Sequence, residues 1–485
     1  MRDMVLILNF DDASSRATAR ALRAEQVYCK IVSRFITEAE VVQQQPLGLI
    51  LAGGLSGTLP GGMDVRLLSG AWPVLAVGDT AAMLCRMLGG DALETAISGS
   101  IEKVQFAPGP LTEGMDDCER VLRNVRRLVL PECAGVLASC REEPVGLAHT
   151  QLPIYGVQFA LEQNDTDGVR LLLNFTLGIC GCTRWWSTQV YADRAVEEIQ
   201  RLVGDGRAVC AMTGGLTSGV TAMLAHRALG ERLQCIFIDT GLMREKEAEH
   251  FLAYYRESLG LSITYVQAQE RFLEALQGVG APQEKRRVIG EMLQRILDET
   301  VQQMGDFSAV LRSTTCNDVL QGMDAVLRPG LRIDAPVIEP LRELFKEEVR
   351  TAAEYLEMPA EIVNRPSFPG GGLALRILGE VSPERLQTLR AADAIFQQEI
   401  DESGLAKRLW HYFCVLSPLL GEDSRSVIAL RAVNAGSTVP LAHAARLPYD
   451  LLERATERIL QERPEVARVV YDLSPSSRAS GVEWQ

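Results

Sequence analysis

The sequence predicts an α/β protein of several domains, and three observations support this prediction. At 485 residues the chain is too long for one hydrophobic core, because single cores rarely grow beyond ~250 to 300 residues. Hydrophobic residues make up 47% of the chain and charged residues 23%, which is typical of folded domains and excludes a disordered chain. Short β-rich runs alternate with helical stretches, which is the pattern of parallel sheets covered by helices.

A first domain is expected over residues 1–187. Helical stretches at residues 17–25 and 81–88 alternate with its β-rich runs, which favours a parallel sheet. The β-rich runs are residues 5–9, 29–33, 48–51 and 73–77.

A second domain is expected over residues 188–365, because a βαβ unit of the nucleotide-binding type begins there. This unit consists of a strand at 207–212, a loop at 213–217, a helix at 218–229 and a strand at 234–239. The glycine cluster at residues 370–372 lies near the start of a third, smaller α+β domain over residues 366–485.

The charge balance argues against nucleic acid as a partner. The chain has 49 Lys and Arg against 63 Asp and Glu, and its net charge of -14 disfavours a polyanion as partner. This net charge does not exclude a single nucleotide bound in a local pocket.

The amino terminus lacks the apolar core of a signal peptide, and no apolar stretch is long enough to span a bilayer, so we expect a cytoplasmic protein without membrane contact. Eleven cysteines without zinc-site spacing and five scattered histidines predict reduced thiols and no metal site.

The most specific pattern is a set of six stretches in order along the chain, one of which contains Asp239-Thr240-Gly241-Leu242-Met243-Arg244. The six stretches are residues 231–244, 269–273, 284–290, 339–346, 377–380 and 445–450. Together they resemble the GMP synthetase family over nearly the whole chain. The resemblance implies a class I glutamine amidotransferase-like domain, an ATP pyrophosphatase domain with a PP-loop, and a carboxyl-terminal dimerisation domain that completes the substrate site. In that family, which acts in purine biosynthesis, ATP adenylylates xanthosine monophosphate, and ammonia released from glutamine displaces AMP to give GMP.

Amidotransferase chemistry needs a thiolate on a strand-to-helix elbow, a histidine base and a carboxylate that orients the base. In the family the elbow cysteine follows a Pro-Val-Leu strand, whereas here Pro73-Val74-Leu75-Ala76-Val77 leads to Gly78. The family's His-Pro-Glu is Ala160-Leu161-Glu162, so the base position is Ala160. Glu162 remains, either as an orienting carboxylate or as a solvated surface group. We therefore expect no intact catalytic residue and no glutaminase activity.

The residues around this elbow have changed as well. The family's Ser-His-Gly-Asp stretch, which holds glutamine, is Leu122-Arg123-Asn124-Val125. Gly53-Gly54 is retained where backbone N–H groups would stabilise an oxyanion, although glycines in a turn also have a structural explanation. Cys85 lies too far along the following helix to replace the elbow cysteine. Asp79 and Arg312 are new charged residues that form no recognisable catalytic arrangement.

The family's PP-loop, Ser-Gly-Gly-Val-Asp-Ser, reads Thr213-Gly214-Gly215-Leu216-Thr217-Ser218 here, so the glycines are kept and Thr217 replaces the aspartate. Its glycines let backbone N–H groups approach phosphates at the amino terminus of a helix. Because that aspartate helps to hold Mg²⁺, we expect ATP as a ligand but not magnesium. The alternative for residues 213–218 is a plain loop that binds no phosphate. The alternative for Asp239 is that it caps the loop that follows it instead of contacting ATP. The predicted ATP-binding residues are Thr213, Gly214, Gly215, Leu216, Thr217, Ser218, Gly219 and Asp239.

Other nucleotide-contacting stretches also depart from the family. Gln-Gly-Thr is replaced by Arg312-Ser313-Thr314, and a lid that contains histidines is shortened to residues 323–330. The basic run Lys285-Arg286-Arg287 either faces phosphate or forms a solvated helix face. In the tail, Arg478 is the candidate replacement for a phosphate-binding lysine. The resemblance assigns six residues to the substrate nucleotide: Arg271, Gly370, Gly372, Arg376, Arg478 and Glu483.

The losses fall at charged and nucleophilic positions, whereas glycines and apolar positions match the family. The leading hypothesis is a pseudoenzyme that binds a purine nucleotide, either ATP or xanthosine monophosphate, and forms a homodimer through the carboxyl-terminal domain. The alternatives are an ammonia-dependent synthetase with residual or altered activity, and a structural partner of an authentic GMP synthetase.

Overall fold

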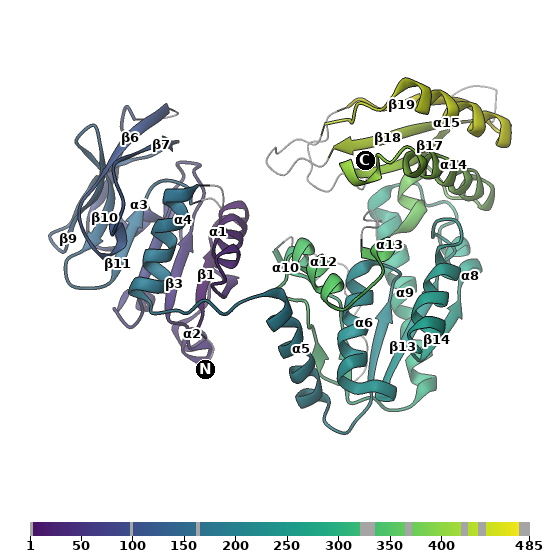
Figure 1. Cartoon of the computed structure of the whole chain (residues 1–485), viewed down its shortest axis with the longest axis horizontal. Coiled ribbons are helices and arrows are strands. Elements are labelled where there is room, and N and C mark those ends of the chain that lie inside the picture. The colour runs from purple at the N-terminus through teal and green to yellow at the C-terminus, as the bar shows by residue number, and fades with distance from the viewer. Residues whose placement is uncertain are drawn as a thin grey trace. The chain divides into compact units, whose positions relative to one another are not determined.

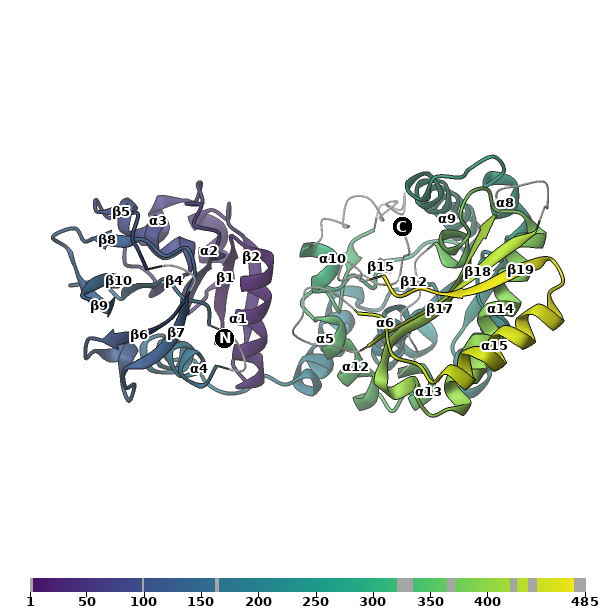
Figure 2. The ribbon, with the colours of Figure 1, turned by 90° about the horizontal axis from the view of Figure 1, so that it is seen from above.

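The computed structural model describes residues 3–97, 100–161, 165–320, 335–363, 371–418, 425–434 and 443–474. The chain divides into two compact units, Met1–Tyr191 and Ala192–Gln485 (Figures 1 and 2). The division lies close to the predicted boundary at residue 187. All eleven cysteines lie in the described segments and are free thiols. No helix within these segments is long and apolar enough to cross a membrane.

The first unit contains a nine-stranded sheet in the order β2-β1-β3-β4-β11-β10-β9-β6-β7. The strands from β2 to β11 are parallel, and the strands from β10 to β7 pair antiparallel. The strands are β1 (Val5–Asn9), β2 (Cys29–Ser33), β3 (Gly48–Ala52), β4 (Val74–Val77), β6 (Ser100–Phe106), β7 (Cys118–Leu122), β9 (Ala134–Cys140), β10 (Glu143–His149) and β11 (Ile154–Val157), with a separate pair β5 (Asp91–Leu93) and β8 (Arg127–Val129). The four predicted β-rich runs are confirmed as β1 to β4.

Helices accompany the parallel half of this sheet (Figure 1). The first helix, α1, begins at Asp12 and not at the predicted residue 17. The Asp11 carboxylate caps it there, because it accepts a hydrogen bond from the Ser14 N–H (2.8 Å). The helices are α1 (Asp12–Ala24), α2 (Glu38–Gln44), η1 (Val65–Leu68), α3 (Asp79–Met87), η2 (Pro110–Thr112), α4 (Thr166–Leu173) and η3 (Asn174–Ile179).

The second unit is built around a five-stranded parallel sheet in the order β14-β13-β12-β15-β16. The strands are β12 (Ala208–Met212), β13 (Leu233–Asp239), β14 (Ile263–Gln267), β15 (Ala309–Leu311) and β16 (Val337–Ile338). The chain leaves β12 toward β13 and later returns on the other side of β12 as β15, so the order reverses between β12 and β15. In open parallel sheets, ligands bind beyond the carboxyl ends of the strands at such a reversal.

The helices of this part include α6, which follows β12 as predicted but begins at Leu216 because Gly215 is its cap. The helices are α5 (Thr188–Val203), α6 (Leu216–Leu229), η4 (Gly230–Arg232), α7 (Glu247–Leu252), η5 (Ala253–Ser258), α8 (Gln269–Ala275), α9 (Pro282–Met304), α10 (Cys316–Leu320), α12 (Lys346–Tyr355) and α13 (Ala360–Val363).

A three-stranded sheet, β17-β18-β19, ends the described chain and packs against α14 and α15 (Figure 2). Alternate residues of β17 face opposite ways: Tyr412, Cys414 and Leu416 join the main core, whereas Phe413 and Val415 form a second cluster. The elements are η6 (Gly372–Arg376), α14 (Pro383–Glu402), η7 (Ala406–Arg408), β17 (Leu409–Pro418), β18 (Ser426–Asn434), α15 (Tyr449–Glu462) and β19 (Val466–Tyr471).

The main core of the second unit is continuous across the predicted boundary at residues 365 and 366. Ile236 of β13 and Ile289 of α9 belong to the same buried cluster as Leu389 of α14 and Ile459 of α15. The separation into a second and a third domain stays a prediction.

A buried carboxylate connects four parts of this unit. Asp393 of α14 accepts a hydrogen bond from the Cys414 N–H (2.9 Å). Its oxygens also lie 3.1 Å from Nε of Arg244 and 3.6 Å from Nη1 of Arg376. The carboxylate thus ties α14 to β17, to the loop after β13 and to η6.

Replacement of this carboxylate should destabilise the second unit strongly. We expect Asp393→Ala to lower the free energy of unfolding by ~3–5 kcal/mol, because two buried guanidinium groups lose their counter-charge. Glu402→Ala, at the exposed end of the same helix, should change it by less than ~0.5 kcal/mol. Urea unfolding followed by circular dichroism measures both, and equal effects of the two changes would contradict the assignment.

Candidate functional site

The first candidate site is the elbow at Gly78, between β4 and α3. Gly78 has φ +70° and ψ −136°, a conformation that glycine adopts readily and other residues rarely do. Its N–H donates to the carbonyl of Val157 at the end of β11 (2.8 Å). The sharp strand-to-helix turn expected of a nucleophile elbow is therefore present, but the residue at its tip carries no side chain.

The space in front of this elbow is filled by peptide backbone. A Cβ atom at position 78 would lie 2.5 Å from the carbonyl oxygen of Gly54 and 2.6 Å from that of Gly53. The Asp79 N–H donates to the Gly54 carbonyl (2.8 Å), and the Gly53 N–H donates to the Val77 carbonyl (3.0 Å). Carbonyl oxygens thus face the elbow, where stabilisation of an oxyanion would need N–H groups.

Three side chains hold residues 53–57, which we call the elbow loop, in this position. The buried Asp79 carboxylate accepts hydrogen bonds from the N–H and hydroxyl of Ser56 (both 2.8 Å) and from the N–H of Gly57 (3.1 Å). Asn124 donates through Nδ2 to the Leu55 carbonyl, and Arg126 donates through Nη2 to the Gly57 carbonyl (both 2.8 Å).

The clamp formed by Asp79, Asn124 and Arg126 was not found from the sequence. Its one local signal is an acidic residue that follows directly after the elbow glycine at the start of a helix. Asn124 belongs to residues 122–125, which are predicted to replace the family's glutamine-holding motif, and in the structure it holds the elbow loop.

Among the described residues, no other group near the elbow supplies a thiolate or a base. Cys85 of α3 is buried and donates through Sγ to the carbonyls of Asp91 (3.4 Å) and Val129 (3.5 Å), and burial raises the pKa of its thiol to about 11. Ala160, just after β11, is half-buried and has no proton-accepting group. Glu162 lies outside the described residues.

The second candidate site is the PP-loop between β12 and α6. Gly214 has φ +79°, and Gly215 caps α6 without a side-chain hydrogen bond. The Ser218 hydroxyl donates to the Gly215 carbonyl (2.9 Å) and accepts from the Thr213 N–H (3.2 Å), which braces the turn. The N–H groups of Leu216, Thr217 and Ser218 point out of the start of the helix and have no acceptor within the described segments. The loop therefore retains the backbone donors of an anion cradle.

The donor set at this loop does not fit Mg²⁺, the ion that PP-loop chemistry implies. The loop itself offers only the hydroxyls of Thr213, Thr217 and Ser218, whereas Mg²⁺ prefers carboxylates. The buried Glu247 carboxylate lies beside Gly214, but it accepts a hydrogen bond from the Arg244 N–H (2.8 Å). Among the described residues, no three of the types His, Cys, Asp and Glu are grouped closely enough to hold a metal ion.

Asp239, at the end of β13, was predicted to bind ATP or to cap its own loop. Its Oδ1 accepts from the Gly241 N–H (2.9 Å), and its Oδ2 accepts from the Tyr265 hydroxyl and from Gln269 Nε2 (both 2.7 Å). The carboxylate is buried and carries three hydrogen bonds from the protein. The capping alternative is present in the structure, and the contact with ATP stays a prediction.

The basic run at the start of α9 does not act as one group. Lys285 is buried and donates through Nζ to the carbonyls of Ala374 (3.1 Å) and Ile377 (2.6 Å), and burial lowers its pKa to about 8. Arg287 pairs on the helix surface with Glu284 and Glu291. These two cations therefore support the fold.

The predicted substrate-nucleotide residues that can be placed also have partners within the protein. Arg271 pairs with Glu299 (2.8 Å), and Gly372, at φ +62°, packs against the Leu242 carbonyl. Arg376 is only 1% exposed, lies 4.2 Å from the centre of the Phe413 ring, and has a pKa lowered by burial to about 10. Gly370, Arg478, Glu483 and the shortened lid at 323–330 lie outside the described residues. The binding of a substrate nucleotide by these six residues stays a prediction.

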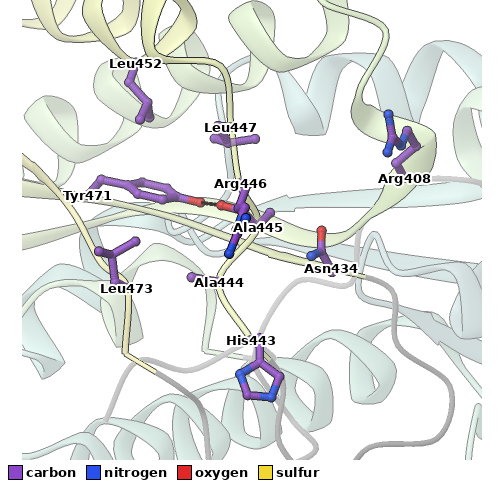
Figure 3. A pocket seen from close by; sticks show the side chains of 10 residues that line it. All are labelled: Arg408, Asn434, His443, Ala444, Ala445, Arg446, Leu447, Leu452, Tyr471 and Leu473. Carbon is purple, nitrogen blue, oxygen red and sulfur yellow. Dashed lines mark hydrogen bonds between the residues drawn. The ribbon is translucent and has the colours of Figure 1, made fainter.

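A pocket of about 750 Å³ lies at the carboxyl ends of β18 and β19 (Figure 3). The Tyr471 hydroxyl donates to the Ala445 carbonyl (2.6 Å) across it, and Arg408, His443 and Arg446 contribute nitrogen-bearing side chains to its lining. All of its lining residues belong to the predicted carboxyl-terminal domain, residues 366–485.

Comparison with known proteins covers the whole chain. Residues 398–484 match the family model described as GMP synthase C terminal domain. The chain is 36% identical to the glutamine-hydrolysing GMP synthase of Thermosynechococcus vestitus, over 100% of this chain and 97% of the relative. It is 34% identical to the enzyme of the same name from Caldicellulosiruptor saccharolyticus, over 100% and 99%. Among solved structures, the NMN synthetase of Francisella tularensis covers 39% of this chain and 78% of its own length, at 18% identity and a TM-score of 0.32, which carries no argument about the sites.

The crowding at the elbow can be tested with two glycines that both lie at positive φ, Gly78 (φ +70°) and Gly89 (φ +96°). Gly78→Ala and Gly89→Ala both place a side chain at positive φ, but the new Cβ meets backbone oxygens at position 78 and open space at position 89. Strain at positive φ costs about 1–2 kcal/mol at each position, and overpacking adds about 1–3 kcal/mol at Gly78 alone. Urea unfolding should rank Gly78→Ala as the less stable variant, and equal losses would mean that the elbow has room for a side chain.

Proposed function

Because the chain belongs to the GMP synthase family, we propose that it is a nucleotide-binding pseudoenzyme: it keeps the fold of the family but neither hydrolyses glutamine nor makes GMP. The relatives are named for both activities, and the identity extends over their full length. The proposal therefore concerns which parts of the family's chemistry survive in this chain.

The observation that supports it most is the closed elbow. Hydrolysis of glutamine through a thioester needs a nucleophile, a base and room for the substrate. Gly78 and Ala160 supply neither nucleophile nor base, and the Gly53 and Gly54 carbonyls occupy the place where a cysteine Cβ would stand. The site is thus closed by backbone as well as chemically empty, which argues against an activity restored by one substitution.

The second unit supports nucleotide binding without synthesis. The backbone donors of the PP-loop are fixed dipoles that attract phosphate without a metal. Thr217 has no carboxylate to link a metal to the protein, and the shortened lid would exclude less water, so electrostatic contacts with a triphosphate would be weaker. We therefore expect weak ATP binding that does not need Mg²⁺.

The carboxyl-terminal sheet supports a homodimer. Tyr449 and Leu473 are 79% and 73% exposed, and Leu473 lines the pocket of Figure 3, within the domain that the resemblance assigns to dimerisation. Exposed large apolar side chains around a pocket are typical of protein interfaces. A purely structural role beside an active GMP synthase would use the same surface.

Activity assays test the pseudoenzyme directly. We expect no glutamate release above buffer and no GMP from xanthosine monophosphate, ATP-Mg²⁺ and saturating ammonium, at rates at least ~10⁴-fold below an active relative, as losses of triad residues produce. The double variant Gly78→Cys with Ala160→His should also stay inactive on glutamine. The T. vestitus enzyme assayed in parallel is the positive control, and GMP formed with ammonium alone would instead establish the ammonia-dependent synthetase.

The dimer is tested by light scattering at micromolar protein. The expected mass is twice the 53.2 kDa of the chain. Leu473→Asp should shift the mass toward that of a monomer because a charge would be buried in the interface. Val65→Asp, at a similarly exposed apolar residue of the first unit, is the matched control and should leave the dimer intact. A wild-type monomer would contradict the proposal.

A further inference from the structure

We propose that Arg312 replaces the metal ion at the PP-loop, so that this site prefers polyphosphate that is not complexed with Mg²⁺. The inference rests on the proposed function, because it assigns a ligand contact within the same nucleotide site. It adds a specific residue and a preference between two forms of the ligand.

The strand order places Arg312 next to the PP-loop. Strands β12 and β15 are parallel neighbours, with Cys210 opposite Leu311, so Arg312 follows opposite Ala211. Neighbouring strands lie about 5 Å apart, and the PP-loop begins only two residues after Ala211. The Arg312 N–H donates to the Ile338 carbonyl (2.9 Å), which fixes the start of this side chain at the carboxyl edge of the sheet, where the strand order reverses.

Arg312 has no carboxylate partner among the described residues, although it is half-buried. Glu339, which follows the adjacent strand β16, pairs with Arg342 and accepts a hydrogen bond from the Thr314 hydroxyl (2.8 Å). In a chain with a net charge of -14, an unpaired arginine at this edge is suited to an anion from solution.

The charges at the loop balance without a metal. An aspartate with bound Mg²⁺ would contribute a net charge of +1 to the loop, and neutral Thr217 with Arg312 contributes the same value. The buried Glu247 carboxylate beside Gly214 is common to both arrangements and leaves this comparison unchanged. A guanidinium also donates two parallel hydrogen bonds to a phosphate, which makes it an effective ligand in the absence of metal.

The same balance predicts an inverted response to magnesium. Mg²⁺ neutralises two negative charges of ATP, and Thr217 offers no carboxylate that could attract the complex in return. Chelation of the metal should therefore strengthen the binding of ATP to this chain. In a PP-loop that holds magnesium through an aspartate, chelation would instead weaken the binding of ATP.

Calorimetry on the full chain tests this assignment with two probes, ATP and inorganic pyrophosphate, each with EDTA and with excess Mg²⁺. The wild type should bind both probes more tightly in EDTA, and Arg312→Gln should lose about tenfold of that affinity, as expected for one charge-assisted contact. Arg201→Gln, at an exposed arginine of α5, is the matched control and should bind like the wild type. Circular dichroism confirms that each variant is folded.

The outcomes separate this inference from the proposed function. Undiminished binding by Arg312→Gln, or tighter binding by the wild type in Mg²⁺, would overturn the role of Arg312 while leaving nucleotide binding in place. Binding of pyrophosphate but not ATP, weakened in Arg312→Gln, would support the phosphate contact and refute the proposed nucleotide function. Absence of binding to either probe would refute both.

Discussion

The close approach of the Gly53 and Gly54 carbonyls to Gly78 is the constraint on which the first unit depends. It requires that position 78 carry no side chain, and it brings the elbow loop within reach of the Asp79 carboxylate. A nucleophilic side chain and this closed loop exclude one another, because both need the same space. Once the loop is closed, Asn124 and Arg126 stabilise it from the segment between β7 and β8.

In the second unit, too, the backbone geometry of a site is present while the charged side chains near it have partners within the protein. The turn at Gly214 and Gly215 and the start of α6 depend on packing and on the Ser218 brace, so the phosphate donors remain when the aspartate is lost. Charged groups at the same edge instead serve the fold: Asp239 caps its own loop, and Arg376 is buried against Phe413. The turn and helix start of an anion site are therefore present, whereas these two charged groups have partners within the protein.

Much of the fold could be predicted from the sequence, because continuous apolar runs such as Val5–Asn9 and the strand-loop-helix order around Gly214 are local patterns. The antiparallel half of the first sheet was not predicted, since its partly exposed strands lack such runs. The roles of Asp79 and Lys285 could not be predicted, because their partners lie far away in the sequence: Asp79 bonds to Ser56, and Lys285 to Ala374 and Ile377. The predicted loss of the nucleophile and the base, by contrast, rests on single residues in the sequence, Gly78 and Ala160.

Amide hydrogen exchange of the elbow loop tests the closed site most directly. The N–H groups of Ser56 and Gly57 donate to the Asp79 carboxylate, and the Asp79 N–H donates to the Gly54 carbonyl. The account predicts slow exchange at these three N–H groups. It also predicts that saturating glutamine leaves their exchange rates unchanged. Asp79→Asn should speed exchange at Ser56 and Gly57, because a neutral amide is a weaker acceptor than a carboxylate. Fast exchange in the wild type, or protection that appears only with glutamine, would mean that the loop opens to a functional glutamine site and would contradict the account.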